Sequence, residues 1–525
     1  MLPLDAETLG HLHSNVSAER LRVSQNSVTT APEDERNRWV SGRRAALASL
    51  ADDPFWPTRK PVRAAYSLAT GRSRDRPVPP GPIGLPVLGS AIPMARDPFT
   101  FFQRCHQKYG DIYRVPLPIH SLVMVNHPEL TGHYMENTEL KYSMTAPIQG
   151  RLAQLLISKL GSPVQALEGP RLRERRRMLM PMFGKRHLTH VSDTFAAEFV
   201  ERVGRWAQRA DSGVEIDLQH ELPKVTLPAF LRSMFSTAIT EQEIREVDID
   251  IRMGMRAIGA GMLMMRPPRI LPIPGTENAP RSLMRITRLC HRIVKERRAN
   301  PTDTPDLLNV LLDARYSDDS PLTDGDLVLE LTGLIGGGYE TVVASLSWTL
   351  ALLLAQPDHL ARLYSEIDSL NGSVPTITDL SRLEWAKSCF DEGQRLQGGP
   401  INMRYAMVDD EIGGYPIPKY TMVGTSLYVV HRDPRWWGDD PNTYDPMNFH
   451  DKQRVKARPR LAFQAFGAGP HHCMGTGMAY MNAQYLLAII FQRYRLQLRP
   501  GWTPQHRFTF STTIKDGLPV TITRA

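Results

Sequence analysis

The sequence predicts a mainly α-helical fold with small β-sheets, an α+β class, in one large domain. Between about residues 165 and 395, apolar residues recur with helical spacing and are interrupted by loops. Stretches with strand-like alternation lie at the two edges of this helical region. Hydrophobic residues make up 42% and charged residues 22% of the 525 residues, which is typical of a folded globular protein and not of a disordered one.

Residues 1–78 are predicted to be an N-terminal extension of uncertain order, because acidic and arginine-rich stretches mix there with short apolar pieces. A globular domain is expected over 79–525, beginning at a proline-rich segment where proline fixes φ and disfavours helix. No early run of about 20 apolar residues could span a bilayer, so we expect no N-terminal transmembrane anchor and a cytoplasmic protein. An organelle transit peptide is disfavoured, because such peptides contain few acidic residues.

Individual elements follow from the same patterns. The segment 98–109 is expected to be a helix, and 111–125 alternates well enough for a pair of strands. A β-hairpin is predicted over 411–417, a strand over 421–430, and a β tail over 508–524. These strands would form small sheets around the helices.

Charge and cysteine content exclude several classes of protein. The net charge of +8 is modest for this length, and no nucleic-acid-binding module is recognisable. The four cysteines are widely spaced without a CxxC pair, which argues against a disulfide framework or structural zinc site and favours a reducing compartment. The apolar stretch Leu327–Ala355 contains Glu330, Glu340 and three consecutive glycines, so a buried core helix is expected there rather than a membrane span.

The segment 466–475 contains a single cysteine, Cys473, between a glycine-rich loop and an apolar amphipathic run. The start of a helix would stabilise a thiolate and lower its pKa, and the thiolate is the form that ligates metal. Glycines permit unusual dihedral angles and the close approach of backbone to a flat object. A lone cysteine in a glycine-rich turn is more often structural, and a zinc site using His471, His472 and Cys473 is disfavoured because three adjacent residues rarely converge on one ion.

The complete pattern changes this interpretation. The order Phe466, Gly469, His471, Cys473 and Gly475 matches F-x-x-G-x-[HR]-x-C-x-G and resembles the cysteine loop of the cytochrome P-450 superfamily, the haem-thiolate monooxygenases. The resemblance covers roughly residues 79–525 and implies the cytochrome P-450 fold. It also implies haem b with Cys473 as the axial thiolate, and Phe466, Gly469, His471 and Gly475 as cofactor-binding residues.

An acid–threonine pair should accompany this loop on a long helix. Gly337, Glu340 and Thr341 supply it, and consecutive glycines cost roughly 1 kcal/mol each against alanine in a helix interior unless the groove that they leave is used. By the resemblance, Gly337 would border the haem, Thr341 would hydrogen-bond the oxygen ligand of the iron or its water, and Glu340 would relay protons. The alternative is that the glycines end one helix and Thr341 caps the next.

A further pair, Glu392 and Arg395, has the E-x-x-R spacing that places both charges on one helical face. Such a pair on a surface would contribute only a few tenths of a kcal/mol. Its position between the acid–threonine helix and the predicted hairpin is similar to that in the family, which implies a buried structural pair.

Haem propionates would be held by Arg176, Arg404 and His471, according to the same resemblance. Arginine suits this role because its planar guanidinium meets a carboxylate with two hydrogen bonds. The chain departs from the family pattern at Leu172, where a tryptophan or histidine propionate donor is usual.

Two further departures lie in the C-terminal half. Asn448 stands where the family usually has an arginine, and its shorter neutral side chain cannot complete the usual charged triad with Glu392 and Arg395. Gly398-Gly399-Pro400 replaces the paired prolines that are common in the family. Altered haem retention and an unusual pocket wall are the expected consequences.

The implied reaction inserts one atom of O₂ into an apolar small molecule of secondary metabolism and releases the other as water. No flavin, nicotinamide or iron–sulfur motif is visible, so a ferredoxin or flavodoxin-type donor with its reductase is expected. Basic clusters at 171–177 and 452–460, including Arg458, could steer an acidic donor. Met262, Met264 and Met265 could form a substrate lid, and core packing explains them equally well.

Three alternatives remain open from the sequence. The protein could bind haem without monooxygenase turnover, although Glu340 and Thr341 argue against this. It could use peroxide or couple carbon atoms, which a requirement for an electron donor would distinguish. A scaffold without haem would be colourless when purified.

Overall fold

The computed structural model describes residues 78–85, 88–117, 121–136, 141–144, 163–264, 277–399 and 401–525, with the side chains of 261–264 left out. Residues 65–525 form one compact unit. Residues 1–77 of the predicted N-terminal extension, Met265, and the side chains of Met262 and Met264 therefore lie outside the described residues.

Helices make up most of the described chain. The α-helices are α4 (Ala91–Arg96), α5 (Pro98–Tyr109), α6 (Pro128–Glu136), α8 (Gly169–Leu179), α9 (Lys185–Gly204), α10 (Ala207–Ser212), α11 (Leu218–Phe235), α12 (Glu241–Met264), α13 (Ala279–Ala299), α14 (Leu307–Asp313), α15 (Asp324–Ile335), α16 (Thr341–Leu353), α17 (Pro357–Asp368), α18 (Glu384–Gln397), α19 (Leu427–Val430), α20 (Pro434–Trp437), α21 (Met447–His450), α22 (Lys452–Ala457) and α23 (Thr476–Arg493). The shorter helices are the 3₁₀ turns η2 (Val164–Ala166), η3 (Met180–Phe183), η5 (Asp379–Ser381), η6 (Arg460–Ala462) and η7 (Gly469–His471) and the π-turn η4 (Gly336–Glu340).

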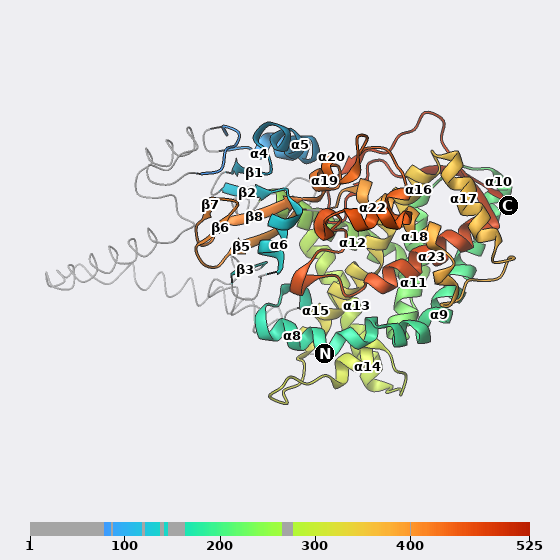
Figure 1. The fold of residues 1–525 in the computed structure, drawn as a ribbon. Coiled ribbons are helices and arrows are strands. Elements are labelled where there is room, and N and C mark those ends of the chain that lie inside the picture. The colour runs from blue at the N-terminus through green and yellow to red at the C-terminus, as the bar shows by residue number, and fades with distance from the viewer. Residues whose placement is uncertain are drawn as a thin grey trace, which may run out of the picture. The chain divides into compact units, whose positions relative to one another are not determined.

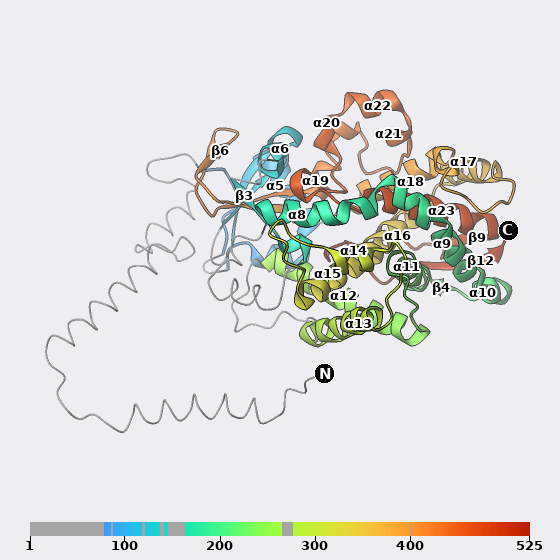
Figure 2. The same ribbon diagram turned by 90° about the horizontal axis from the view of Figure 1, so that it is seen from below.

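The described residues also form four small sheets. The strands are β1 (Ile112–Pro116), β2 (Ser121–Val125), β3 (Tyr142–Ser143), β4 (Ile216–Asp217), β5 (Ile401–Ala406), β6 (Asp410–Ile412), β7 (Tyr415–Ile417), β8 (Met422–Ser426), β9 (Tyr494–Leu498), β10 (His506–Arg507), β11 (Thr513–Ile514) and β12 (Pro519–Arg524). The largest sheet has the order β1-β2-β8-β5-β3, in which β2 and β8 are parallel and the other neighbours are antiparallel. In Figures 1 and 2 this sheet lies on one side of the compact unit and most of the helices on the other.

The core is built around two long helical segments. The first runs from α15 through the π-turn η4 into α16, and every residue from Val342 to Ala351 is buried. The second is α18, which packs along α16, and α23 packs against α18 and α9. Thr349 is so close to Gly393 that any β-carbon there would overlap its side chain, which explains the glycine in the middle of α18. The packing of α16, α18 and α23 brings together segments that lie far apart in the sequence.

Among the described residues, one helical stretch is long and apolar enough to cross a bilayer, Asp324–Leu353, and 72% of its most apolar window is buried inside the protein. It overlaps the stretch Leu327–Ala355 that the sequence predicted to be a core helix, and Glu330 and Glu340 in it are buried.

Most of the predicted elements appear where the sequence placed them. The helix at 98–109 is α5, which Asp97 caps by accepting a hydrogen bond from the Thr100 N–H. The strand predicted over 421–430 was wrong in its second half, because the chain leaves β8 at Ser426 and turns into the short helix α19. In the C-terminal tail, residues 508–512 form a turn between β10 and β11 rather than a continuous strand. Their hydrogen bonds to helix side chains take the place of a sheet ladder.

Candidate active site

The loop around Cys473 is held in a tight shape by backbone contacts. The Cys473 N–H donates to the Phe466 carbonyl over 2.9 Å. Gly469 has φ of +68°, and a β-carbon there would overlap the carbonyl oxygen of Met135 at the end of α6. The glycine is therefore required both by its backbone conformation and by close packing. The loop ends at α23, whose first residue is Thr476.

The environment of the Cys473 thiol differs from the expectation in one respect. Although Cys473 is exposed, desolvation by the protein atoms around the thiol raises its pKa, while the Gly475 N–H, the Thr476 hydroxyl and the Arg176 guanidinium each lower it. The net direction is upward, so the sequence prediction of a lowered pKa was wrong for the protein without a metal. Desolvation exceeds the effect of the helix start because the cysteine lies three residues before α23. A coordinated metal cation deprotonates a thiol outright, which removes this obstacle.

Across the core, the long helix opens at its π-turn. Gly337 is exposed in an otherwise buried stretch, and nothing lies within 4 Å of the position that a β-carbon would take. Its neighbour Gly338 is closed off by the ring of Phe230. Thr341 is partly exposed one turn later and its hydroxyl donates to the Gly337 carbonyl over 2.8 Å. One face of a core helix therefore borders open space, which a flat cofactor can fill.

The glycines do not end a helix. Ile335 and Thr341 on either side of the π-turn both have right-handed helical dihedrals, and no side chain caps either boundary. The alternative of two helices with Thr341 as N-cap is therefore contradicted. Single π-turns inside α-helices often occur at functional sites.

Glu340, the acid beside Thr341, is almost fully buried with 3% of its surface exposed. The hydroxyl of Ser511, from the turn between β10 and β11, donates a hydrogen bond to its Oε2. Burial raises the pKa of Glu340 to about 7, the Ser511 hydroxyl lowers it, and Asp248 raises it. The acid is therefore able to exchange a proton near neutral pH.

Two arginines present positive charge without an anionic partner among the described residues. Arg404, on β5, is 3% exposed, donates to the Met403 carbonyl over 2.7 Å and keeps a buried Nε atom that has no hydrogen-bond partner. Arg176, on α8, lies close enough to Cys473 for its charge to lower the pKa of the thiol. Buried cations normally have a partner, so an anionic group of a ligand fits here.

The adjacent arginine of α8 has a different role. Arg175 is wholly buried and its Nη1 lies 2.6 Å from Oε2 of Glu330, which is also wholly buried and accepts the Val164 N–H over 2.9 Å. This ion pair joins α8 to α15. Only Arg176 of these neighbours is therefore available to a cofactor.

His471 lies in the cysteine loop as expected but makes a contact that the sequence did not suggest. Its Nε2 is 3.0 Å from Oε2 of Glu168, the residue before α8. Glu168 also accepts from the Met144 N–H over 2.6 Å and from the Ser143 hydroxyl over 2.9 Å. The imidazole is thus oriented by a protein carboxylate in this structure.

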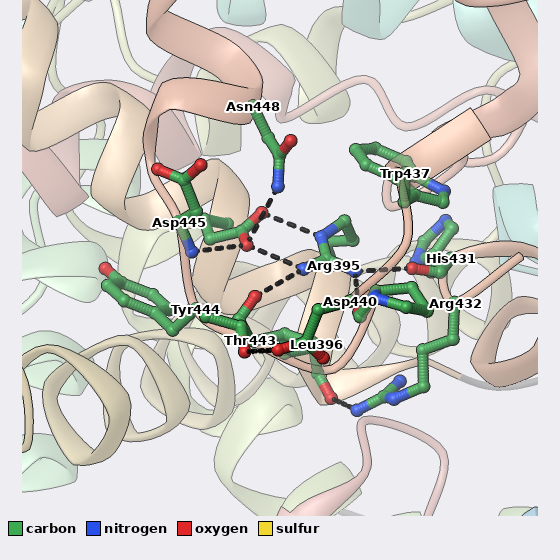
Figure 3. A network of polar contacts seen from close by, with 12 residues as sticks. Arg395, Leu396, His431, Arg432, Trp437, Asp440, Thr443, Tyr444, Asp445 and Asn448 are labelled. Atoms are coloured by element: carbon green, nitrogen blue, oxygen red, sulfur yellow. Dashed lines mark hydrogen bonds and ion pairs between the residues drawn. The ribbon is translucent and has the colours of Figure 1, made fainter. Parts of the chain in front are cut away.

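Glu392 and Arg395 form a fully buried pair (Figure 3). Arg395 donates to both carboxylate oxygens of Glu392, over 2.7 and 2.6 Å. The same guanidinium donates to the carbonyls of His431, Pro441 and Thr443 over 2.7, 2.6 and 3.0 Å. A single side chain therefore fixes the segment 431–443 to α18. This segment leads to the cysteine loop.

The residue that was expected to leave this network incomplete takes part in it. Asn448 donates from Nδ2 to Glu392 over 3.2 Å (Figure 3). Its carbonyl accepts a hydrogen bond from Arg458, which packs over the ring of Trp437 at 4.2 Å. The charge of Glu392 raises the pKa of Arg458, although burial lowers it to about 10 overall. Arg458 thus supplies the positive charge that Asn448 lacks.

The other two departures also have a local explanation. Leu172 is 3% exposed and belongs to the main hydrophobic core, so α8 gains packing where a propionate donor is absent. Gly398 has φ of +72° and ends α18, and Gly399 faces Leu427 so closely that a β-carbon would contact its side chain at 2.7 Å. Pro400 lies outside the described residues.

Sequence reasoning missed Glu168, Arg458 as a network residue, and Ser511. Arg458 stands in a run of basic residues and therefore resembled surface charge. Ser511 lies 171 positions after Glu340, so no local pattern connects them.

The described residues include a cysteine in a glycine-rich loop, a buried arginine whose Nε has no hydrogen-bond partner among them, and a π-turn that borders open space. In a comparison with known proteins, the family model described as Cytochrome P450 matches residues 79–519, and the chain belongs to this family.

Relatives and solved structures extend this result. The chain is 29% identical over 455 residues to cyclooctat-9-en-7-ol 5-monooxygenase of Streptomyces melanosporofaciens, covering 85% of this chain and 95% of that protein. It is 27% identical over 421 residues to pentalenene oxygenase of Streptomyces avermitilis, covering 80% and 91%. The crystal structure of the cytochrome P450DA heme domain shares the fold, with a TM-score of 0.72, 20% identity and coverage of 85% and 97%.

The predicted family, fold class and cofactor are confirmed: the protein is a haem-thiolate monooxygenase that uses O₂ and requires a redox partner. Its class is that of oxygen-incorporating oxidoreductases, as the sequence predicted.

Proposed function

We propose that Cys473 is the axial ligand of the haem iron and that Arg176 and Arg404 bind its propionates. The observation that carries this assignment is the buried Nε of Arg404, which has no hydrogen-bond partner among the described residues. Arg176 supports it, because its charge acts on the Cys473 thiol and lowers the pKa of that group. Phe466, Gly469 and Gly475 shape the loop around the sulfur. His471 is the third propionate partner and changes its contact from Glu168 to the cofactor.

The bound haem-thiolate supplies reductive activation of O₂, because a thiolate ligand increases electron density at iron and favours O–O cleavage. The chain supplies position and protons. Gly337 leaves room beside the helix, and the Thr341 hydroxyl, which donates to Gly337 in this structure, is a hydrogen-bond donor on that open face. Glu340 holds a proton at its carboxyl group near neutral pH and passes it toward Thr341.

An apolar terpenoid is the substrate class that we propose, because cyclooctat-9-en-7-ol and pentalenene are named in the descriptions of the relatives. The residue before the open face, Gly336, packs against apolar side chains: a β-carbon there would contact Met255 at 3.2 Å and Ile251 at 3.6 Å. Met255 and Ile251 lie on α12, at whose end the predicted methionine lid begins. Such a surface suits a hydrocarbon skeleton.

Electrons would come from a ferredoxin or flavodoxin with its reductase, and the protein would work in the cytoplasm. The exposed basic residues Lys452, Arg454 and Lys456 on α22 support docking of an acidic donor. Arg458 does not belong to this surface, because it donates to Asn448 and packs over Trp437. A charge-reversing substitution of Arg458 would disturb the Glu392 network, so such a variant cannot test docking of the donor.

The experiment is turnover of a panel of apolar terpenoids under ¹⁸O₂, with a ferredoxin, a flavodoxin or hydrogen peroxide as alternative sources of electrons. The proposal predicts one ¹⁸O atom in the product and a strict need for the donor protein. Activity with peroxide alone would favour a peroxide-using enzyme. Haem binding without any product across the panel would favour a carrier without turnover. Thr341→Ala is the matched variant, expected to lower product formed per O₂ consumed.

A further inference from the structure

Glu340 and Thr341 are neighbours in the sequence with different surroundings. Thr341 is partly exposed on the open face of the helix and donates to Gly337. Glu340 is buried, and its carboxylate accepts a hydrogen bond from the Ser511 hydroxyl. The acid that should deliver protons is therefore held by a residue of the C-terminal turn, far from it in the sequence.

This turn is fixed independently of Glu340. The Gln397 side chain of α18 donates from Nε2 to the carbonyls of Ser511 and, over 3.1 Å, Thr512. Its Oε1 accepts the Ser345 hydroxyl of α16 over 2.9 Å. Trp348 of α16 donates to the Thr512 carbonyl over 2.9 Å, and Thr512 has φ of +51°. Two core helices thus position the Ser511 hydroxyl.

The charged groups that face Glu340 lie on α12. Asp248 disfavours the ionised form of the acid and Arg252 favours it, and the two are themselves 2.7 Å apart as an ion pair. The helix α11 presents the apolar ring of Phe230 to this turn of the helix. Because the α12 charges offset one another, the Ser511 hydroxyl is the local contact that favours the carboxylate against burial.

We propose that Ser511 is the positioning residue of Glu340: its hydroxyl holds the carboxylate of the acid against the C-terminal turn and sets the pH at which Glu340 accepts a proton. The proton is taken up at a carboxyl oxygen and leaves from the same group toward Thr341, so the acid returns to its ionised form. This inference rests on the proposed role of Glu340 as proton relay.

The test is an infrared pH titration of the carboxyl band in the haem-loaded protein, with the Glu340 signal assigned by its absence in Glu340→Gln. In Ser511→Ala the midpoint should rise by about one pH unit or more, because a hydrogen bond to a charged group is lost. Ser511→Thr keeps a hydroxyl and should titrate like the wild type. The wild-type midpoint in Ser511→Ala, or an equal shift in Ser511→Thr, would overturn the proposal.

A second measurement separates this inference from the proposed function. If Glu340→Gln leaves the product formed per O₂ consumed unchanged, the relay role of Glu340 fails even when the infrared shift is found. If the relay is confirmed and the infrared midpoint does not respond to Ser511→Ala, only the assignment of Ser511 fails.

Discussion

Two buried glutamates on adjoining helical segments, Glu392 and Glu340, differ in the hydrogen-bond donors that surround their carboxylates. Glu392 accepts two hydrogen bonds from Arg395, one from the Asp445 N–H over 2.8 Å and one from Asn448. For Glu340, the donor among the described side chains is Ser511. Both acids are almost inaccessible to solvent, with 0% and 3% exposed.

The difference separates structure from chemistry. A buried carboxylate that is matched by a guanidinium and several further donors forms a fixed ion pair that orders the chain around it. A buried carboxylate with few donors has a raised pKa and can exchange protons under physiological conditions. Glu392, beside the segment that leads to the cysteine loop, is a carboxylate of the first kind. Glu340, in the π-turn, is of the second kind.

The largest expected effect comes from breaking the fixed pair. Arg395→Met should lower the free energy of unfolding by about 3–5 kcal/mol and reduce haem content, because it leaves Glu392 buried without its cation. The measurement is urea unfolding together with the ratio of haem to protein. Arg382→Met is the matched control, since Arg382 and Asp379 have the same i,i+3 spacing but Arg382 is 52% exposed. Equal losses of unfolding free energy and haem content in Arg395→Met and Arg382→Met would show that burial of the Glu392–Arg395 pair has no special role.

A smaller effect is expected from Glu340→Gln, and it depends on pH. The pKa of Glu340 is about 7 in the folded protein and 4.5 ordinarily, so the folded state binds more protons than the unfolded state between these values. Wild-type stability should therefore fall as pH rises through this range, by on the order of 3 kcal/mol for this group. Glutamine does not titrate and should lose this dependence. If the free energy of unfolding changes by the same amount between pH 5 and pH 8 in the wild type and in Glu340→Gln, the raised pKa of Glu340 is refuted.

Arg458→Gln should cost about 1–2 kcal/mol, because the hydrogen bond to the Asn448 carbonyl and a compensating charge near Glu392 are lost. Arg454→Gln is the control, since Arg454 is 51% exposed and pairs with Asp445. Adding Asn448→Arg to Arg458→Gln should restore part of the loss, because it moves the charge to the position usual in the family. Absence of any loss in Arg458→Gln would show that the charge is not needed there.

The smallest expected effect is on the rate of reduction by the electron donor, and it concerns the exposed basic residues of α22. Lys456→Glu should slow reduction by an acidic donor a few-fold at low ionic strength and leave stability nearly unchanged, because Lys456 is exposed. Stopped-flow reduction at two salt concentrations measures this. Lys419→Glu, on the loop between β7 and β8, is the control for charge alone. Equal rates in the two variants would reject docking at α22.

The sequence sufficed for what depends on local pattern. Helical spacing located the buried helix that carries Glu340 and Thr341, and the cysteine motif located the loop of Cys473. The helix α5 was predicted to the residue because Asp97, Pro98 and Gly110 mark its ends.

What it could not supply depends on contacts across hundreds of residues. Arg458 looked like one of several surface charges, and only its tertiary contacts with Trp437 and the Asn448 carbonyl connect it to the Glu392 network. The hydrogen bond from Ser511 to Glu340 and the contact of the His471 imidazole with the Glu168 carboxylate likewise arise from tertiary structure. The direction of the pKa shift of Cys473 was predicted wrongly because the desolvation of the thiol by the atoms around it is not visible in a motif.

The most direct measurement is the absorption spectrum of the reduced, carbon-monoxide-bound protein beside that of Cys473→Ser. The account predicts the red-shifted Soret band of a thiolate-bound haem in the wild type and its loss in the variant. A folded wild-type protein that purifies colourless from haem-supplied cells, or a variant that keeps the band, would contradict the assignment of Cys473 as the iron ligand.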